Sequence, residues 1–228
     1  VSPLSRLLRG EGDARQKPGY GEGAFTLQEE GAQVIGLALG ARDGEKVLDA
    51  CAGRGQKSTL LAERLGGGSL TACDLYPEKL AALAEEVARL KLPDVATRAV
   101  DWSVGQGGLP QDFDRVLVDA PCSGTGTLRR RPEILRRLGP QDPARLGALA
   151  EQILRSAASR AKIGGSVLFA VCSVLKQECE DVVARVSDIL EPSPFDAPEL
   201  APELVAGKTS LRLLPGLHGT DGYFMAHF

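Results

Sequence analysis

The sequence has 228 residues, of which 43% are hydrophobic, so it is long enough for one sizeable domain with its own core. Its formal net charge of −3 argues against a protein that coats nucleic acid by charge alone, and no apolar run approaches the ~18 residues that a membrane-spanning helix needs. The five cysteines include no Cys-x-x-Cys pair and there are only two histidines, which argues against a metal site. The odd number of cysteines and the lack of a secretory signal pattern predict a reduced, cytoplasmic protein.

Residues 1–26 are rich in Gly, Arg and Glu and lack periodicity, so we expect an N-terminal arm or linker ahead of a domain formed by residues 27–228. Helical patterns then cover residues 27–39, 58–65, 77–90, 143–162 and 177–190. Short apolar runs typical of strands lie at residues 46–50, 70–74, 96–100, 115–119 and 165–171. Residues 191–210 contain four prolines and are expected to form a surface loop. Residues 211–215 and 222–228 are expected to pair as a closing hairpin.

Strands that alternate with helical segments indicate right-handed crossovers and a mainly parallel sheet with helices on both faces. The predicted fold is therefore α/β, a doubly wound, Rossmann-like sheet with an antiparallel strand at its C-terminal end. In such sheets, ligands bind at the carboxyl ends of the strands. The unusual residues that fall at these ends are Asp49, Asp74, Asp119, Cys122 and Cys172.

The stretch DACAGRGQKS, residues 49–58, follows the first strand and indicates a ligand loop. Gly53 and Gly55 permit a sharp turn close to a ligand, but a dinucleotide fingerprint requires a third glycine where Ser58 stands. Asp74 ends the second strand, where a carboxylate can accept both ribose hydroxyls, and Asp101 after the third strand can accept from an adenine amino group. Together these residues predict an S-adenosylmethionine site. The alternative is a plain tight turn with aspartates that cap helices.

Two cysteines follow strand ends, in DAPCSGTGTLRRRPEI and AVCSV. A thiolate that adds to C6 of cytosine makes C5 nucleophilic, so methyl transfer to C5 becomes feasible, and a nearby acid such as Asp119 stabilises the adduct. The base must leave its stack to reach such a site. The alternative is that a cysteine serves as a small buried hydrophobe, which is our interpretation of Cys73 and Cys179. These arguments do not rank Cys122 against Cys172.

Four motifs, in this order and spacing, resemble the RsmB/Sun-type RNA cytosine-C5 methyltransferases, whose bacterial members act on 16S ribosomal RNA. The motifs are DACAGRGQKS, DAPCSGTGTLRRRPEI, AVCSVLKQECE and LPGLHGTDGYFMA. The resemblance extends from about residue 19 to the end. It implies that Cys172 is the nucleophile, that Cys122 assists product release, and that Asp119 contacts the base and the methionine end of the cofactor. It places S-adenosylmethionine against Cys51, Ala52, Gly53, Arg54, Gly55, Gln56, Lys57, Asp74, Asp101 and Asp119.

The sequence departs from the usual family pattern at three positions. Arg54 replaces a proline and Gln56 a glycine in the first loop, and Val171 stands where a threonine usually precedes the nucleophile. A side chain at a position that requires a positive φ strains the backbone. We therefore expect a strained loop with weaker cofactor binding, in an enzyme that is still active.

A group of arginines beyond Cys122 predicts an RNA-binding patch for backbone phosphates, opposed in sequence only by Glu133. The group comprises Arg129, Arg130, Arg131, Arg136 and Arg137. Charge runs are often only solvated faces. Family members of this type carry an N-terminal RNA-binding domain, so target selection here is expected to need a missing N-terminal domain, residues 1–26 or a partner. Two rival functions remain: an RNA-binding pseudoenzyme or assembly factor, and a nicotinamide-dependent oxidoreductase on a similar sheet.

Overall fold

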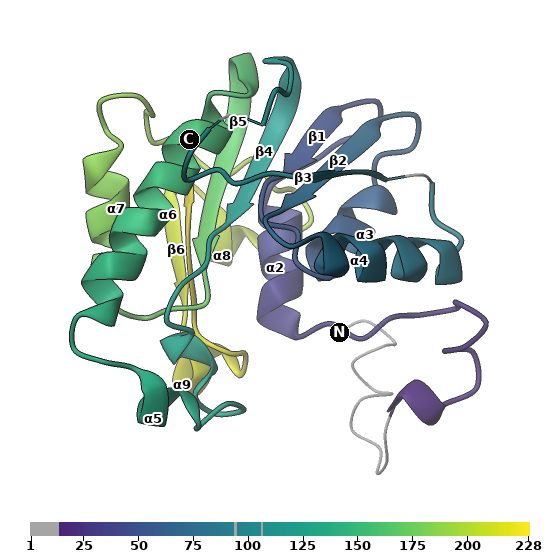
Figure 1. Cartoon of the computed structure of the whole chain (residues 1–228), viewed down its shortest axis with the longest axis horizontal. Coiled ribbons are helices and arrows are strands. Elements are labelled where there is room, and N and C mark those ends of the chain that lie inside the picture. The colour runs from purple at the N-terminus through teal and green to yellow at the C-terminus, as the bar shows by residue number, and fades with distance from the viewer. Residues whose placement is uncertain (1–13, 94, 106) are drawn as a thin grey trace.

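The computed structural model describes residues 14–93, 95–105 and 107–228, which form a twisted sheet of seven strands with helices on both faces (Figure 1). The strands are β1 Lys46–Asp49, β2 Ser69–Asp74, β3 Ala96–Ala99, β4 Phe113–Asp119, β5 Ala161–Val171, β6 Ser210–Leu213 and β7 Tyr223–His227. Their order across the sheet is β3-β2-β1-β4-β5-β7-β6. The first five strands pair in parallel, and β7 pairs antiparallel with both β5 and β6. The predicted doubly wound sheet and its closing hairpin are both confirmed.

Eight α-helices and three short 3-10 turns among the described residues accompany this sheet. The α-helices are α2 Glu30–Ala38, α3 Gln56–Ala62, α4 Pro77–Arg89, α5 Ile134–Arg137, α6 Asp142–Ala158, α7 Glu180–Arg185, α8 Pro202–Val205 and α9 Pro215–His218. The 3-10 turns are η1 Ala14–Gln16, η2 Thr125–Thr127 and η3 Lys176–Glu178. Among the described residues, none of these helices combines the length and the apolar composition that crossing a bilayer requires.

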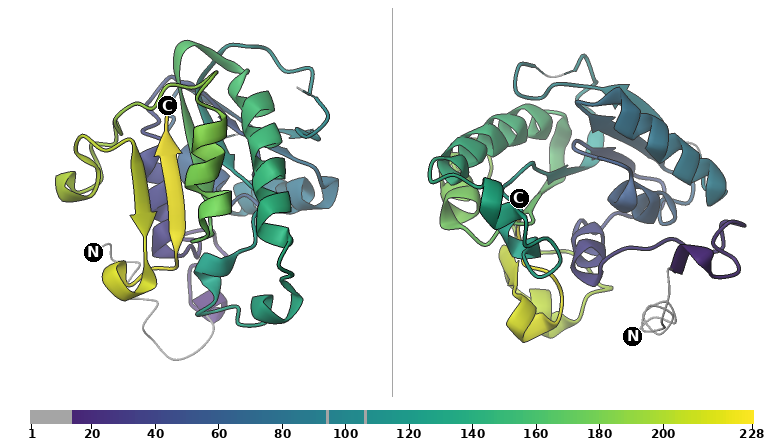
Figure 2. Two further views of the ribbon diagram at one scale, coloured as in Figure 1. Left: turned by 90° about the vertical axis from the view of Figure 1, so that its left-hand side faces the viewer. Right: turned by 60° about the horizontal axis from the view of Figure 1, so that its bottom comes forward.

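Helices cover both faces of the sheet (Figure 2), and the side chains of the central strands alternate between the two cores beneath them. In β4, Val116 and Val118 pack into the cluster that contains α6 and α7, whereas Leu117 packs into the cluster that contains α2 and α3. Phe169 in β5 is fully buried on the α6 face. Because side chains alternate along a strand, an unbroken apolar run serves both layers at once. This explains why the strands were evident in the sequence as continuous apolar stretches.

Helix boundaries differ from the prediction where tertiary pairing competes with helix propensity. The helix expected to reach residue 162 ends at Ala158, because Ala161 already pairs with Phe113 and begins β5. The helix expected over 177–190 is reduced to α7, since Cys179 has φ −113° and ψ −102° and interrupts the helical backbone after η3. The helix expected at 58–65 starts at Gln56 instead, directly after Gly55.

The proline-rich stretch 191–210 is largely the exposed surface loop that the sequence predicted, but it contains the short helix α8 and four buried apolar residues. Phe195, Ala197, Leu200 and Val205 are buried in the same cluster as α2 and α3. Prolines prevent extended pairing in this stretch, but the apolar residues between them still cover the sheet. The composition therefore indicated irregular, exposed backbone correctly and did not reveal the four apolar residues that anchor the stretch to the core.

The segment before α2 lies along α4. The guanidinium of Arg89 donates hydrogen bonds to the backbone oxygens of Tyr20 and Phe25, at 3.2 Å for the latter, and stacks 4.0 Å over the Tyr20 ring. Residues 20–25 are thus anchored to the domain. The rest of the predicted arm, residues 1–13, lies outside the described residues.

Candidate active site

The residues singled out at strand ends converge at one edge of the sheet. Asp49, Asp74 and Asp119 are the last residues of β1, β2 and β4, and Cys172 directly follows β5. Successive strands run outward from β1 in one direction and from β4 in the other, so the crossover connections diverge between these two neighbours. This is the switch point at which doubly wound sheets bind ligands.

The glycine loop after β1 adopts the conformation that its two glycines permit. Gly53 and Gly55 have φ of +56° and +89°, and a Cβ at Gly55 would come within 2.5 Å of Leu83. The Gly53 N–H donates a 2.9 Å hydrogen bond to Asp74. Arg54 and Gln56 do not have positive φ: among the described residues, Lys91 is the one non-glycine residue with a positive φ. The expected strain at these two positions is therefore absent.

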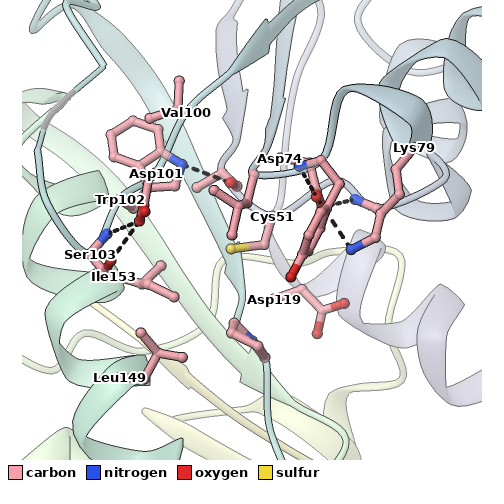
Figure 3. A pocket seen from close by; sticks show the side chains of 15 residues that line it. Cys51, Asp74, Lys79, Val100, Asp101, Trp102, Ser103, Asp119, Leu149 and Ile153 are labelled. Atoms are coloured by element: carbon pink, nitrogen blue, oxygen red, sulfur yellow. Dashed lines mark hydrogen bonds and ion pairs between the residues drawn. The ribbon is translucent and has the colours of Figure 1, made fainter.

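One cavity, of about 310 Å³, lies at the carboxyl ends of the central strands, and we call it the slot (Figure 3). Asp74 and Asp101 lie on its rim, and apolar side chains from α6, Leu149 and Ile153, form one wall. The carboxylate of Asp74 also accepts from the Tyr76 N–H at 3.0 Å and contacts Lys79 at 3.3 Å. Asp74 thus shapes the turn before α4 in addition to facing the slot, but it does not cap α4, whose N-cap residue is Tyr76.

A second cavity, of about 400 Å³, adjoins the first, and both are lined by Cys51, Gly53, Lys79 and Asp119. Its other walls include Asp49, Ala52, Arg54, Gln56 and Lys57. Gly55, which was also expected to bind the cofactor, lines neither cavity and instead precedes the first turn of α3. The nine other predicted cofactor residues all border this pair of cavities.

Charged groups at the floor of the second cavity are buried and have shifted pKa values. Burial raises the pKa of Asp49 to about 6, although Ser58 donates a 2.7 Å hydrogen bond to one of its oxygens. The other oxygen, Oδ1, is buried without a hydrogen-bond partner. Burial also lowers the pKa of Lys57, but the carboxylate of Asp119, 2.6 Å from its Nζ, more than offsets this and the net shift is upward. Lys57 is therefore a permanent cation beside Asp119.

The two strand-end thiols lie side by side. The Sγ atoms of Cys122 and Cys172 are 3.4 Å apart, and both residues are partly exposed. The hydrogen bond between them lowers the pKa of Cys172, assisted by the charge of Lys57 and opposed by burial and Asp119, whereas the same bond and burial raise the pKa of Cys122. Neither sulfur lines the two cavities; the link is the Lys57–Asp119 pair, which lines the second cavity and acts on Cys172.

The other cysteines behave differently. Cys73 and Cys179 are fully buried, and burial raises the pKa of each to about 12. Their interpretation as small hydrophobes is confirmed. Cys51 borders both cavities, and burial raises its pKa well above the ordinary value.

The turn that carries Cys122 is closed by the C-terminal segment. The Gly126 N–H donates to the Cys172 carbonyl at 3.0 Å, and the Gly222 N–H donates to the Gly126 carbonyl at 2.8 Å. A Cβ at Gly126 would lie 2.0 Å from the Gly222 carbonyl oxygen, so this approach requires glycine. The motif near the end of the sequence is thereby part of the site.

The arginine group is less free than the sequence suggested. Besides Glu133, which accepts from Arg131 at 3.2 Å, the buried carboxylate of Asp221 accepts from Arg130 at 2.6 Å and from Arg129 at 3.4 Å. The expectation that only Glu133 opposes the group is wrong, because Asp221 is distant in sequence and arrives with the C-terminal segment. The arginine side chains remain about half exposed.

Comparison with known proteins assigns the chain to a family. The model of the family described as "16S rRNA methyltransferase RsmB/F" matches residues 36–228. The chain belongs to this family. Relatives include the probable ribosomal RNA small subunit methyltransferase B of Bacillus subtilis, 34% identical, and its namesake in Erwinia tasmaniensis, 38% identical; the matches cover 90% and 92% of this chain. The crystal structure of PH0851 is similar, with a TM-score of 0.84, 29% identity and 96% of this chain and 50% of that chain covered.

The chain spans about half the length of the curated RsmB relatives that it matches, 48% of each. Membership in the RsmB/F methyltransferase family removes the nicotinamide-dependent oxidoreductase from consideration. It also agrees with the missing third glycine at Ser58. The described residues contain no group of three or more His, Cys, Asp or Glu side chains arranged to hold a metal ion.

Sequence reasoning gave no role to two residues of this RsmB/F site. Asp49 was noted only for its place at a strand end, although a buried acid at the first letter of the glycine motif is a usable signal. Glu178 lies within KQECE, which was taken as an ordinary helix, and its hydrogen bonds to the thiol-bearing turns depend on the tertiary fold.

Proposed function

We propose that this chain transfers a methyl group from S-adenosylmethionine to C5 of a cytosine in small-subunit ribosomal RNA, through a transient bond between Cys172 and C6. The observation that carries the proposal is the pair of thiols, 3.4 Å apart, beside the Lys57–Asp119 ion pair at the edge of the cofactor-sized cavities. Family membership supports the reaction class and the RNA substrate.

The residues present fit S-adenosylmethionine. The apolar slot suits adenine, with Asp101 as acceptor for its amino group, and Asp74 suits the ribose hydroxyls. The buried Oδ1 of Asp49 has no hydrogen-bond donor within the chain. An ammonium group of the ligand could donate to it and would match its negative charge. When bound, the cofactor supplies an electrophilic methyl group on a sulfonium. The contribution of the chain is to bind it at the switch point and to prepare the nucleophile.

Cys172 is suited to attack because a thiolate is the reactive form and its pKa is lowered by the hydrogen bond from Cys122. Addition of its sulfur to C6 places negative charge on the N3 and O2 side of the ring. The ammonium of Lys57 can donate there, and the carboxylate of Asp119 can accept from the exocyclic amino group. An acceptor and a donor 2.6 Å apart thus match adjacent edges of cytosine.

Release requires loss of the C5 proton and cleavage of the bond between C6 and the sulfur of Cys172. Cys122 is placed to accept that proton after passing its own to solvent, since its sulfur lies next to the nucleophile. Elimination then returns Cys172 as a thiolate. The proposal gives the two thiols different roles, because the charge of Lys57 lowers the pKa of Cys172.

The arginine group and α5 lie on the substrate side of the site, and Arg136 and Arg137 have exposed side chains for phosphate contacts. The target base must be turned out of its stack to reach a thiol at the sheet edge. Selection among the cytosines of the ribosomal RNA is assigned to the arm at residues 1–26, to a partner or to an N-terminal domain.

The test compares two variants on small-subunit ribosomal RNA. Cys172→Ala is expected to abolish 5-methylcytosine, measured by bisulfite mapping, whereas Cys122→Ala is expected to accumulate a covalent RNA–protein adduct that resists denaturation. Equal activity of both variants contradicts the assignment. Calorimetry with S-adenosylmethionine separates the enzyme from the RNA-binding pseudoenzyme, which predicts no binding of the cofactor.

A further inference from the structure

A buried carboxylate lies behind the two thiols. Glu178, the last residue of η3, has no exposed surface. The cations of its own surroundings are engaged elsewhere, since Lys176 pairs with Asp181 and Arg212 pairs with Glu180. A buried charge is tolerated only when hydrogen bonds replace its hydration. The identity of those donors therefore shows what this carboxylate holds.

Three donors reach the carboxylate, and each belongs to the residue directly after one of the thiols. The backbone N–H of Ser123 donates to Oε1 of Glu178 at 2.6 Å, and the Ser123 hydroxyl donates to Oε2 at 2.6 Å. The hydroxyl of Ser173 donates to the same Oε2 at 2.5 Å. One side chain thus ties the turn after β4, which carries Cys122, to the turn after β5, which carries Cys172.

Further contacts make the connection stiff. Thr125 Oγ1 lies 3.1 Å from the Ser173 hydroxyl and accepts from the Val174 N–H at 3.3 Å. The Ser173 hydroxyl also accepts from the Leu175 N–H at 3.1 Å. The hydroxyls of Ser123, Thr125 and Ser173 thus share one hydrogen-bond network with Glu178. Such networks restrict the conformations that the buried turns can adopt.

We propose that Glu178 is a positioning residue that holds the two thiol-bearing turns together and so fixes the spacing between Cys122 and Cys172. It does not touch the reacting atoms; it acts through Ser123 and Ser173. The inference rests on the proposed function for the role of the thiols, whereas the positioning itself can be measured without RNA or cofactor. A carboxylate suits the task because it accepts all three hydrogen bonds and donates none.

The test measures disulfide formation between Cys122 and Cys172 in the reduced chain, with diamide as the oxidant. Diamide takes up the two thiol hydrogens and is reduced to the hydrazine as the S–S bond forms. The reaction is stopped at intervals with N-ethylmaleimide, and the specific linkage is counted by peptide mass spectrometry. The sulfurs need to close only from 3.4 Å to about 2.05 Å, so rapid formation is expected in the wild-type protein.

Glu178→Ala is expected to slow this cross-linking by about 10- to 100-fold, the usual effect of displacing reacting groups by about 1 Å. Glu178→Gln keeps the length and one acceptor oxygen but replaces the other by a donor, so it is expected to recover only part of the rate. Glu180→Ala, at an exposed glutamate two residues away, is the matched control and is expected to react like wild type. In methyl-transfer assays on small-subunit ribosomal RNA, Glu178→Ala is expected to lose kcat by a similar factor with KM unchanged.

Cross-linking of Glu178→Ala at the wild-type rate overturns the proposal. If that variant does not fold, the double variant Ser123→Ala/Ser173→Ala replaces it, because it retains the carboxylate and removes two of its three donors; the same slowing is expected. Slowed cross-linking together with no methyl transfer by the wild-type chain supports the positioning and refutes the proposed function.

Discussion

The unpartnered carboxylate of Asp49 leads to a prediction about stability and pH. Asp49 is buried at the end of β1, and its pKa in the folded chain is about 6, compared with an ordinary value of 3.8. Between these values the folded chain holds a proton that the unfolded chain has released. The free energy of unfolding therefore falls as pH rises through this window. The shift of 2.2 pKa units, 6 minus 3.8, corresponds to about 3 kcal/mol.

Asp49→Asn replaces the acid by a neutral side chain of the same shape, so the variant does not lose unfolding free energy as pH rises through this window. The difference in unfolding free energy between variant and wild type is expected to grow by about 3 kcal/mol, in favour of the variant, from about pH 4 to about pH 8. Urea unfolding at several pH values measures it. Asp188→Asn is the control with the opposite sign, because Arg155 lowers the pKa of Asp188 and its ionised form stabilises the fold.

The same variant is expected to bind S-adenosylmethionine more weakly by about 10- to 100-fold, the loss of a charged hydrogen bond of about 1.5–3 kcal/mol. Calorimetry at about pH 8 measures this affinity. A gain in stability with a loss of binding is typical of a group retained for its ligand. A stability difference that does not change with pH refutes the argument about burial, and unchanged affinity refutes the role assigned to Oδ1.

Three further outcomes follow from the geometry. Gly126→Ala is expected to lower the unfolding free energy by ~1–3 kcal/mol and to abolish methyl transfer, because its Cβ would meet the Gly222 carbonyl oxygen. The control Gly216→Ala, which has open space around it, is expected to behave as wild type. Urea unfolding and the transfer assay compare the two variants. Phe169→Ala in the core is expected to cost about 3–5 kcal/mol, measured by urea unfolding, and a cost under about 1 kcal/mol contradicts its place in the core. The methyl-transfer rate is expected to rise with pH with a midpoint below the ordinary thiol value of 9.0, and Lys57→Met is expected to move that midpoint upward; an unmoved midpoint argues against Lys57 as an influence on Cys172.

Apolar strand patterns and the glycines at turns were sufficient to predict the sheet from the sequence. The run RVLVD, residues 115–119, predicted β4 because it packs on both faces, and Gly53 and Gly55 predicted the ligand loop because they alone tolerate the left-handed backbone there. Strand ends are local features, so Asp74, Asp119 and Cys172 could be placed at one edge before any contact was known. Helix ends at Ala158 and Cys179 could not be predicted, since pairing with β4 and burial of Glu178 decide them.

Contacts between distant segments account for what the sequence concealed. Nothing in the arginine run around Arg130 indicates that Asp221 will arrive beside it, or that Phe195 will turn inward from a proline-rich stretch. The different roles of the two thiols are a proposal that rests on the family resemblance and on the charge of Lys57, which lowers the pKa of Cys172. Residue types predicted the chemistry of the site, and spatial proximity is needed to assign the roles.

The backbone contact between Gly126 and Gly222 has a consequence for the order of assembly. These residues are 96 positions apart, 222 minus 126, and their backbones are in direct contact through a hydrogen bond. Bringing such remote parts of a chain together requires closing a long loop, which delays their meeting during folding. Docking of the tail, which inserts β7 between β5 and β6, is therefore expected to be a late step of folding that completes the thiol-bearing turn.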